Sequence, residues 1–430
     1  MSRPVVVINA RLLDPASGLD VKGGLLIVGG RIAEVGPAVS VTLAPGGTEV
    51  IDARGLCLAP GLVDLRVQLG EPGAEHKERI DSGAAAAAAG GVTSMAVLPN
   101  TDPPIDEPAM VEFVARRARQ VKLGKIYPYA AITKRLEGRE LAEIGLLKAA
   151  GAIAFTDGER ALANARVMRR ALAYARNFDA LVVQHPEEPT LAEHGLMNEG
   201  ALASRLGLAG IPAAAEAIMV ERDLRLLALT GGRLHVAHVS TAEAIAAIRA
   251  AKDRGLPVTC DTAPHYLALN ELEVEGYRTF AKVSPPLRGE EDRRAVVEGL
   301  KDGTIDVIAS DHCPQDQDSK RLPFAQAAHG VIGVQTMLPV CLRLWHEGAL
   351  SLLDLLGKMT AAPARILGLE AGRLAKGAPA DLVLFDPEAP WKITEASLKS
   401  LSKNTAFEGR LVEGRVARTM VDGRTIFAAD

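Results

Sequence analysis

Four acidic or histidine side chains stand directly after apolar runs in the middle of this 430-residue chain. They are Asp157 after Ala-Phe-Thr, His185 after Leu-Val-Val-Gln, His238 after His-Val-Ala, and Asp311 after Ile-Ala-Ser. Carboxylate and imidazole groups bind divalent metal ions, and a carboxylate beside such an ion can act as a general base. A single histidine after a strand is more often a hydrogen-bonded structural residue. Four such positions together favour a metal-dependent site.

A second set of polar residues lies in the stretch 60–72, where apolar and polar residues alternate. The alternation predicts a strand that places Asp64, Arg66 and Gln68 on one side and the apolar residues on the other. Arg66 and Gln68 stand nearest the end of this strand. Asn100 has the same place after the next apolar run. These residues therefore belong to the same candidate site.

The elements that must position these side chains alternate between strand and helix. Eight strand–helix units in about 300 residues are typical of an α/β fold of the (β/α)8, TIM-barrel type, whose chemistry lies at the carboxyl ends of the strands. We assign this barrel to residues 56–364. Strands are expected at 62–68, 93–98, 126–132, 152–156, 180–185, 234–239, 257–261 and 305–310, and helices at 81–89, 108–120, 160–176, 212–230, 241–254 and 290–301.

The two ends of the chain have a different texture. Short β-branched runs occur in residues 1–55 and again in 365–430, with Gly29-Gly30 and Asp422-Gly423 as hairpin turns. Two β-rich ends around a different middle predict a small β-sandwich domain built from both chain termini.

Composition narrows the classes of function. The net charge of −4 gives no indication of a nucleic-acid partner. The four cysteines are far apart and form no Cys-x-x-Cys motif, which suits a reducing compartment. There is no apolar run of ~18 residues and no signal-peptide pattern. We therefore expect a cytoplasmic protein without a membrane segment.

Several other polar residues have a structural explanation. Asp64 lies early in its strand and is expected to be a buried hydrogen-bonding residue. His235 is expected to pack between strand and helix, and Cys313 to be a small buried thiol. Four further histidines are assigned to loops or to the surface: His76, His194, His329 and His346.

The motifs together resemble those of the class I dihydroorotases of the amidohydrolase superfamily. The resemblance covers nearly the whole chain, and PNTDP, PPLR and SDH in this order are its most specific segments. It rests on PGLVDLRVQLGEPGAEHKE, AAAAAGGVTSMAVLPNTDP, AFTDG, HVST, PHYLALNE, PPLR, DGTIDVIASDHCP and KNTAFEG. The resemblance implies zinc-dependent hydrolysis of a cyclic amide in pyrimidine biosynthesis.

Residue by residue, the resemblance implies one intact zinc site and one degenerate site. Active members carry a His-x-His pair at the end of strand one, where this chain has Arg66 and Gln68. The position of Asp157 implies a carboxylate that bridges two metals, and those of His185 and His238 imply ligands of the second zinc. We therefore expect one zinc per chain or none.

The positive charge of Arg66 also argues against a zinc ion at the first site. The aspartate matching Asp311 completes that site in the family and moves protons. The guanidinium of Arg66 is a permanent cation that opposes a zinc ion beside it. We expect Arg66 instead to form an ion pair with Asp311 or Asp157.

The substrate-binding positions implied by the resemblance are also altered. The family's carboxylate-gripping arginine is Gly70 here, its asparagine before Pro-Pro-Leu-Arg is Ser284, and a further histidine is Gln315. Only Asn100 of this group remains. Each lost charged contact removes ~1.5–3 kcal/mol of binding and part of the substrate's orientation.

Three functions are compatible with these residues. The leading hypothesis is a catalytically degenerate dihydroorotase homologue that serves as a structural partner of aspartate carbamoyltransferase, as inactive dihydroorotase-like chains do in some bacteria, and that forms oligomers. The alternative is an enzyme, a cyclic amidohydrolase with one zinc on Asp157, His185 and His238 and with Asp311 as general base. The third is an ordinary dihydroorotase with unusual ligands.

Overall fold

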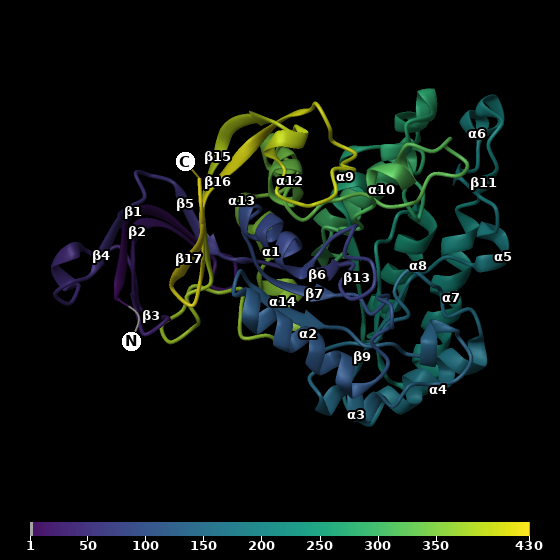
Figure 1. The fold of residues 1–430 in the computed structure, drawn as a ribbon, viewed down its shortest axis with the longest axis horizontal. Coiled ribbons are helices and arrows are strands. Elements are labelled where there is room, and N and C mark those ends of the chain that lie inside the picture. The colour runs from purple at the N-terminus through teal and green to yellow at the C-terminus, as the bar shows by residue number, and fades with distance from the viewer. Residues whose placement is uncertain (1–2, 430) are drawn as a thin grey trace.

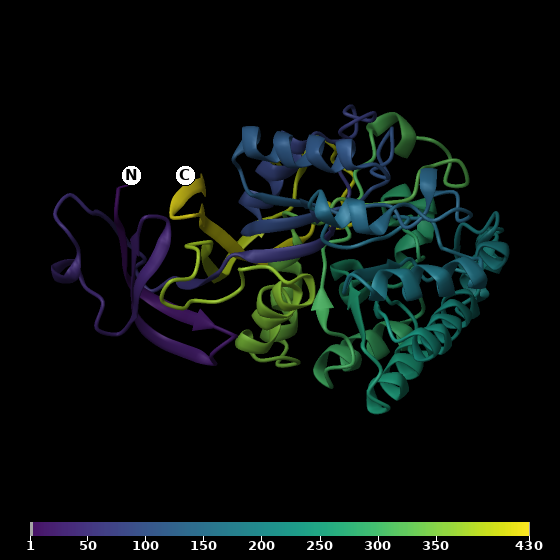
Figure 2. The same ribbon diagram turned by 90° about the horizontal axis from the view of Figure 1, so that it is seen from below.

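The computed structural model describes residues 3–429, which form a sheet at one end of the molecule and a body of strands and helices at the other (Figure 1). The first and last strands of the chain belong to the same sheet, so both chain ends lie at that end of the molecule (Figure 2). Within the described residues, no helix is long and apolar enough to cross a membrane.

Eight strands from both ends of the chain make up the sheet, in the order β17-β16-β15-β5-β1-β2-β3 with β4 beside β1. Residues 422 and 423, with φ of 47° and 71°, form the predicted turn between β16 and β17. The strands are β1 (Val5–Asp14), β2 (Leu19–Val28), β3 (Arg31–Gly36), β4 (Glu49–Asp52), β5 (Cys57–Pro60), β15 (Leu382–Lys392), β16 (Leu411–Val421) and β17 (Arg424–Ala428).

This sheet curls back on itself. Ile32 of β3 donates its amide to the Ala378 carbonyl at 2.9 Å, and Ala378 lies in the segment that leads into β15. Apolar side chains from both ends of the sheet, including Leu12, Leu25 and Leu382, form one buried core. A second, larger core belongs to the body.

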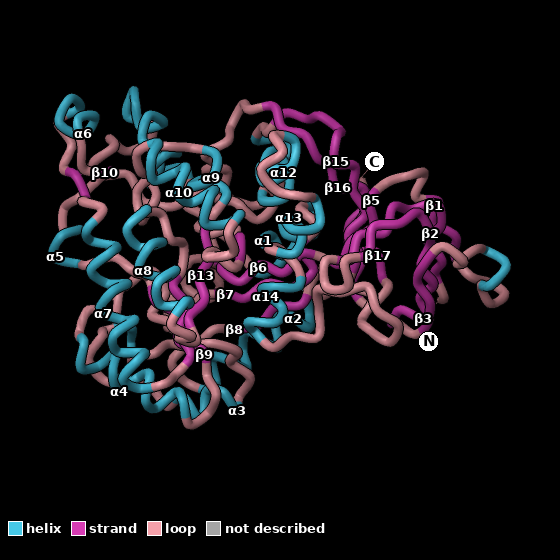
Figure 3. Tube along the Cα trace, turned by 180° about the vertical axis from the view of Figure 1, so that it is seen from behind, coloured by secondary structure: helices cyan, strands magenta, loops and turns pink. Residues whose placement is uncertain are grey.

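Parallel strands lie in the middle of the body, with helices around them (Figure 3). Their pairings form two sheets, β6-β7-β8 and β14-β13-β12-β9. Phe155 bridges Ala130 after β8 to Val182 of β9, and Val67 of β6 bridges His312 after β14. The strands are β6 (Leu62–Val67), β7 (Val92–Val97), β8 (Lys125–Pro128), β9 (Leu181–Gln184), β12 (Arg233–Val236), β13 (Val258–Thr262) and β14 (Val307–Ile308).

Several of the expected strands are shorter than the sequence suggests, among them 126–132, where β8 covers only Lys125–Pro128. Residues 152–156 make only a bridge at Phe155, although its amide donates to Leu181 and so keeps the segment beside β9. The expected strand at 305–310 is reduced to β14. The strained backbone at Asp311, with φ of 48°, ends regular pairing there.

The expected helices are present and pack through apolar faces. In α4, Asn164 caps the first turn by accepting hydrogen bonds from the amides of Arg166 and Val167, and the buried residues recur at helical spacing. The main helices are α1 (Ile80–Ala89), α2 (Pro108–Val121), α3 (Ile144–Ala149), α4 (Ala165–Arg176), α7 (Ala214–Thr230), α8 (Ala242–Asp253), α10 (Glu290–Lys301), α12 (Met337–His346), α13 (Leu352–Gly357) and α14 (Ala361–Leu367).

Short elements fill the loops at the carboxyl ends of the parallel strands. They are α5 (Pro189–Ala192), β10 (Met197–Asn198), α6 (Ala201–Leu206), β11 (Gly210–Ile211), α9 (Pro264–Ala268) and α11 (Gln317–Lys320). The irregular segment 263–286 lies among them, between β13 and α10.

Candidate functional site

The strand-end site consists of Arg66 and the side chains that follow the neighbouring strands, and two of these have unusual backbone conformations. His238, directly after β12, has φ of 36°, and Asp311, after β14, has φ of 48°. Such a conformation costs a non-glycine residue ~1–3 kcal/mol and persists only where the surroundings fix it. The amide of His238 is held by the Asp261 carboxylate at 2.8 Å.

A buried ion pair occupies this site. Arg66 donates through Nε to Asp311 Oδ1 at 2.7 Å, and their side chains are only 4% and 13% exposed. The predicted pairing of Arg66 with one of two carboxylates is thus confirmed for Asp311. Burial lowers the pKa of Arg66, but attraction to Asp311 and Asp261 outweighs it and leaves the pKa raised. The site therefore contains a permanent cation.

The two histidines expected to bind metal contact each other instead. His185 Nδ1 lies 3.1 Å from His238 Nε2, so one ring donates a hydrogen bond to the other. On its other side, His185 Nε2 lies 3.6 Å from the Glu187 carboxylate. Burial, reinforced by the charge of Arg66, holds the pKa of His238 well below its ordinary value. His238 is therefore a neutral imidazole.

Asp157 is turned towards the loop that follows β8. Its Oδ1 accepts hydrogen bonds from the amides of Ile132 at 3.0 Å and Thr133 at 2.9 Å, and its Oδ2 accepts the Thr133 hydroxyl at 2.5 Å. Burial raises the pKa of Asp157 despite these bonds. Its carboxylate is already satisfied by protein donors.

A metal ion does not fit these residues as they are placed. Among residues 3–429 no group of three or more His, Cys, Asp or Glu side chains is arranged to hold one. Asp157 faces Thr133, the rings of His185 and His238 use their facing nitrogens on each other, and Arg66 adds a positive charge. The ligand set inferred from the sequence stays a prediction that requires these side chains to turn.

His265 at the start of α9 is a site residue that the sequence reasoning missed. Its Nε2 lies 3.7 Å from Asp311 Oδ2 and has no hydrogen-bond partner among the described residues. Burial lowers the pKa of His265 to about 4, although Asp311 acts in the opposite direction. Its place in the motif Pro-His-Tyr, directly after a predicted strand, was the signal that could have identified it.

Cys313 takes part in the hydrogen bonding of the site. Its Sγ lies 2.9 Å from Gln68 Oε1 and 2.9 Å from Glu159 Oε1. Burial and the Glu159 carboxylate raise the pKa of the Cys313 thiol well above its ordinary value. The expected buried thiol is confirmed, and its contact holds the side chain of Gln68 in place.

The position of Gly70 leaves no room for a side chain. A Cβ atom there would lie 2.0 Å from the Ala74 carbonyl oxygen. The loop is held in this position because the Gly70 amide donates a hydrogen bond to the Glu78 carbonyl at 2.9 Å. Segment 70–79 therefore occupies the space that the side chain of an arginine at position 70 would need.

The other altered substrate positions are occupied by protein contacts. Ser284 donates its hydroxyl to Glu187 Oε2 at 3.0 Å. The backbone amide of Gln315 donates to Asn404 Oδ1 at 3.2 Å, and its side-chain Nε2 lies 3.5 Å from Cys313 Sγ. Asn100 lies beside Gly158, and its Oδ1 has no hydrogen-bond partner among the described residues. Within this group, Asn100 Oδ1 and Gln315 Oε1 are both buried polar atoms without a hydrogen-bond partner among the described residues.

The residues assigned structural roles lie mostly as expected. Asp64 is fully buried and accepts the amide of Ser310 at 3.1 Å, and His235 is buried with Nε2 2.7 Å from Asp261 Oδ2. His76 and His194 are exposed, with 64% and 90% of their side chains accessible. His346, the last residue of α12, is exposed and lies 3.4 Å from the Glu413 carboxylate.

His329 lies in a loop, as expected, and it is half-buried there. Burial, together with the charge of Lys282, lowers the pKa of His329 to about 4, and Glu187 acts in the opposite direction. A loop position in sequence therefore did not reveal that this residue packs near the strand-end site.

Comparisons with known proteins agree with the motifs. A family model described as "Dihydro-orotase-like" matches residues 55–244. A protein named dihydroorotase from Pelobacter propionicus is 46% identical over 98% of this chain and 99% of its own length. One of the same name from Anaeromyxobacter dehalogenans (strain 2CP-1) is 47% identical over 100% of this chain and 99% of its own.

Solved structures show the same fold at lower identity. The L-hydantoinase (dihydropyrimidinase) from Arthrobacter aurescens is 26% identical, with a TM-score of 0.88 over 99% of this chain and 96% of its own. The dihydropyrimidinase from Brevibacillus agri is 24% identical, with a TM-score of 0.85 over 98% and 94%, which bears on the fold alone. The identity of 46% along nearly the full length of both chains shows that this chain belongs to the dihydroorotase family.

Proposed function

We propose that this chain is a catalytically degenerate dihydroorotase homologue of pyrimidine biosynthesis, retained as a structural partner of aspartate carbamoyltransferase. The observation that carries the proposal is the buried ion pair between Arg66 and Asp311. The carboxylate that would act as general base is neutralised by an internal cation, and the guanidinium stands at the strand end where active members supply imidazole ligands.

Charge balance explains how such a site persists without chemistry. A carboxylate as buried as Asp311 is costly unless a cation compensates for it. Arg66 supplies that cation from within the chain, so the fold does not depend on a metal ion. Arginine stays protonated at all physiological pH values, and the compensation is therefore permanent.

The substrate side supports the same proposal. Dihydroorotate carries a carboxylate, and the position of its arginine partner is Gly70, where the Ala74 carbonyl oxygen blocks any side chain. The Ser284 hydroxyl is engaged by Glu187, and the side-chain Nε2 of Gln315 lies 3.5 Å from Cys313 Sγ. The blocked position 70 and the contact of Ser284 support the proposal that substrate binding was lost together with the first metal site.

The proposal takes the fold to be a (β/α)8 barrel that spans residues 56–364, with a β-sandwich domain from 1–55 and 365–430. The bridges at Phe155 and Val67 support a closed ring, because they join the two parallel sheets at both edges. The contact between Ile32 and Ala378 supports a sandwich-like closure of the terminal sheet. We also propose that the chain forms homo-oligomers and is located in the cytoplasm.

A second candidate is a cyclic amidohydrolase that uses a single zinc on Asp157, His185 and His238. It is favoured by the retention of all three residues and by the 3.1 Å contact between the two rings, which places two imidazoles side by side. The zinc would supply Lewis acidity and a water of lowered pKa. This function requires Asp157 to leave Thr133 and Asp311 to be released by Arg66.

Two measurements on the purified chain decide between these functions. We expect negligible turnover of dihydroorotate and of carbamoyl-aspartate with zinc added, and less than one tightly bound metal per chain by elemental analysis. A kcat of ~1–10 s⁻¹, ordinary for an enzyme, would overturn the degenerate function. One zinc per chain that is lost in the His185→Ala variant would support the single-zinc enzyme.

A further inference from the structure

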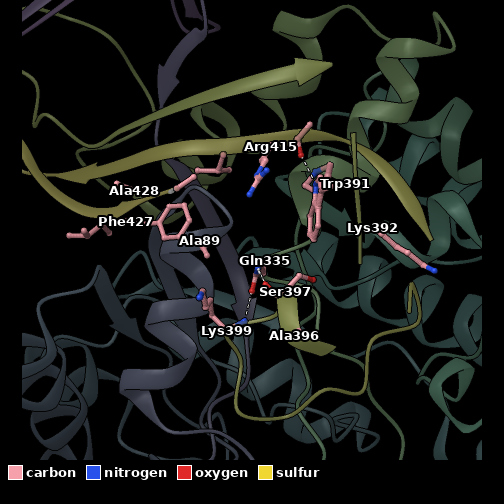
Figure 4. Close-up of a pocket in the computed structure, with 15 residues that line it drawn as sticks. Ala89, Gln335, Trp391, Lys392, Ala396, Ser397, Lys399, Arg415, Phe427 and Ala428 are labelled. Atoms are coloured by element: carbon pink, nitrogen blue, oxygen red, sulfur yellow. Dashed lines mark hydrogen bonds between the residues drawn. The ribbon is translucent and has the colours of Figure 1, made fainter. Parts of the chain in front are cut away.

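A cavity of about 640 Å³ lies away from the strand-end site, against the terminal sheet. Its walls come from β15, β16 and β17, from the start of α12, and from the segment 396–399 (Figure 4). This volume lies within the range of ~300–1,000 Å³ that is usual for small-ligand sites. No role in the proposed function involves this cavity.

The charged residues that line the cavity are all positive. They are Arg415 of β16, Lys392 of β15 and Lys399, and no Asp or Glu lines the cavity among the described residues. None of the three forms an ion pair within residues 3–429. The cross-strand neighbour of Arg415 is Asp386, which does not line the cavity. The cavity therefore suits an anion.

Two aromatic residues line the same cavity. Figure 4 shows Arg415 between the side chains of Trp391 and Phe427, with its guanidinium directed towards the middle of the cavity. The indole Nε1 of Trp391 donates to the Gly414 carbonyl at 2.9 Å, which fixes the orientation of the ring. A fixed aromatic ring can stack on a flat ring, and a guanidinium beside it can bind an anionic group attached to that ring.

The segment that carries Lys399 is held in place. Gln335 accepts the Lys399 amide through Oε1 at 2.7 Å and donates through Nε2 to the Ser397 carbonyl at 2.8 Å. The oxygen and the nitrogen of the Gln335 side-chain amide thus both bind the segment that carries Lys399 (Figure 4). The backbone position of the second cation is fixed before any ligand binds, which reduces the ordering cost of binding.

We propose that this cavity binds a planar aromatic anion of the size of a nucleoside monophosphate. The phosphate is bound by Arg415 and Lys399, and the base packs against Trp391 or Phe427. Arginine suits the phosphate because its planar fork can donate two parallel hydrogen bonds. Recognition rests on the fixed cations and aromatic rings, and it is independent of the strand-end site.

Tryptophan fluorescence gives a direct test, because the chain has only two tryptophans. In a Trp345→Phe background, Trp391 is the only tryptophan and reports on the cavity. We expect UMP or AMP to change its emission saturably, with a Kd below ~1 mM. Uridine and inorganic phosphate, each with half of the recognised features, should bind at least about tenfold more weakly.

Charge variants in the same background separate site binding from general attraction. Arg415→Gln and Lys399→Gln should each weaken nucleotide binding about tenfold or more. Arg119→Gln is the matched control, since it removes an exposed cation of α2 outside the cavity, and it should bind as the parent does. The urea midpoint of each variant confirms that it is folded.

Three results would overturn the proposal. One is the absence of a saturable signal up to ~10 mM nucleotide. The second is unchanged nucleotide affinity in both Arg415→Gln and Lys399→Gln. The third is equal affinity for inorganic phosphate and nucleotide, which would leave no role for the aromatic walls.

Discussion

Arg66, at the end of β6, compensates the charge of the buried Asp311 carboxylate, and this single residue sets the charge of the strand-end site. Its guanidinium is within 2.7 Å of Asp311 and influences the neutral imidazole of His238. A histidine at position 66 would leave Asp311 without its ion-pair partner at neutral pH unless a metal ion took that place. The identity of residue 66 therefore decides whether the fold depends on metal.

Removing this cation should destabilise the protein strongly. We expect Arg66→Ala to lower the free energy of unfolding by ~3–5 kcal/mol, because it strands the buried charge of Asp311. Urea denaturation measures the change. Arg11→Ala is the matched control: its pair with Asp20 is also 2.7 Å long, but the side chains are 39% and 37% exposed. That variant should change the stability by no more than ~1 kcal/mol.

Equal stability of Arg66→Ala and the parent protein would contradict this account of charge balance. So would a crystal structure with the guanidinium of Arg66 in bulk solvent.

Rebuilding the imidazole pair should restore metal binding without restoring activity. In the double variant Arg66→His, Gln68→His, a zinc ion can replace the guanidinium as the compensating cation, so the metal content should rise by about one ion per chain. Elemental analysis after dialysis measures it, with Gln68→His alone as the control that keeps Arg66. Dihydroorotase activity should stay absent because Gly70 is unchanged. A double variant that binds no more metal than the control would refute this prediction.

At the scale of elements, segment 70–79 links the strand-end site to the C-terminal part of the chain. The Glu78 carboxylate accepts hydrogen bonds from the Ser82 hydroxyl at 2.5 Å and from the Leu401 amide at 2.9 Å, and it also accepts the Ser400 hydroxyl. Burial raises the pKa of Glu78, but His312 and these hydroxyl donors together leave it lowered. The segment that blocks position 70 is thus held by buried, charge-assisted bonds.

A second carboxylate joins β6 to the end of β14. Asp64 accepts the amides of Ser310 and Arg66, and burial raises its pKa to about 6 from an ordinary value of 3.8. Between about pH 4 and 6 the folded state keeps a proton that the unfolded state has released. The contribution of Asp64 to stability therefore falls as the pH rises through this window.

The Asp64→Asn variant should lack this dependence on pH. The parent should lose up to ~3 kcal/mol of stability relative to Asp64→Asn between pH 4 and 6, which corresponds to the raised pKa. Urea midpoints at several pH values measure the difference. Asp253→Asn, at an exposed position at the end of α8, should keep the slope of the parent. Parallel curves for the parent and Asp64→Asn would refute the assignment.

At the scale of the whole molecule, periodicity in the sequence predicted the elements well. Alternation and helical spacing placed β6, β7, β9 and β12, and the helices between them, close to their observed bounds. These patterns follow from burial, which acts on every residue of an element. The charge argument also limited the partner of Arg66 to Asp311 or Asp157, because a buried guanidinium at a strand end has few carboxylates within reach, and the structure shows Asp311.

The sequence did not predict which way individual side chains turn. Asp157 is bound by Thr133, which lies in a loop 24 residues earlier in the chain. His265 and His329 enter the region of the site from irregular loops whose course depends on packing. Such contacts are set by tertiary structure and leave no periodic pattern in the sequence.

The whole molecule should associate with aspartate carbamoyltransferase if its scaffold, rather than its chemistry, is what the cell uses. A retained scaffold would keep the fold and the 46% identity to a protein named dihydroorotase that this chain has. Mixed with the transcarbamoylase of its own organism at ~10 μM each, the chain should elute as a larger complex, and native mass spectrometry should give its stoichiometry. The Gln68→His variant alters the site but no surface, so it should assemble equally well. Separate elution of the two proteins at this concentration would exclude the partnership and leave the single-zinc enzyme as the function to test.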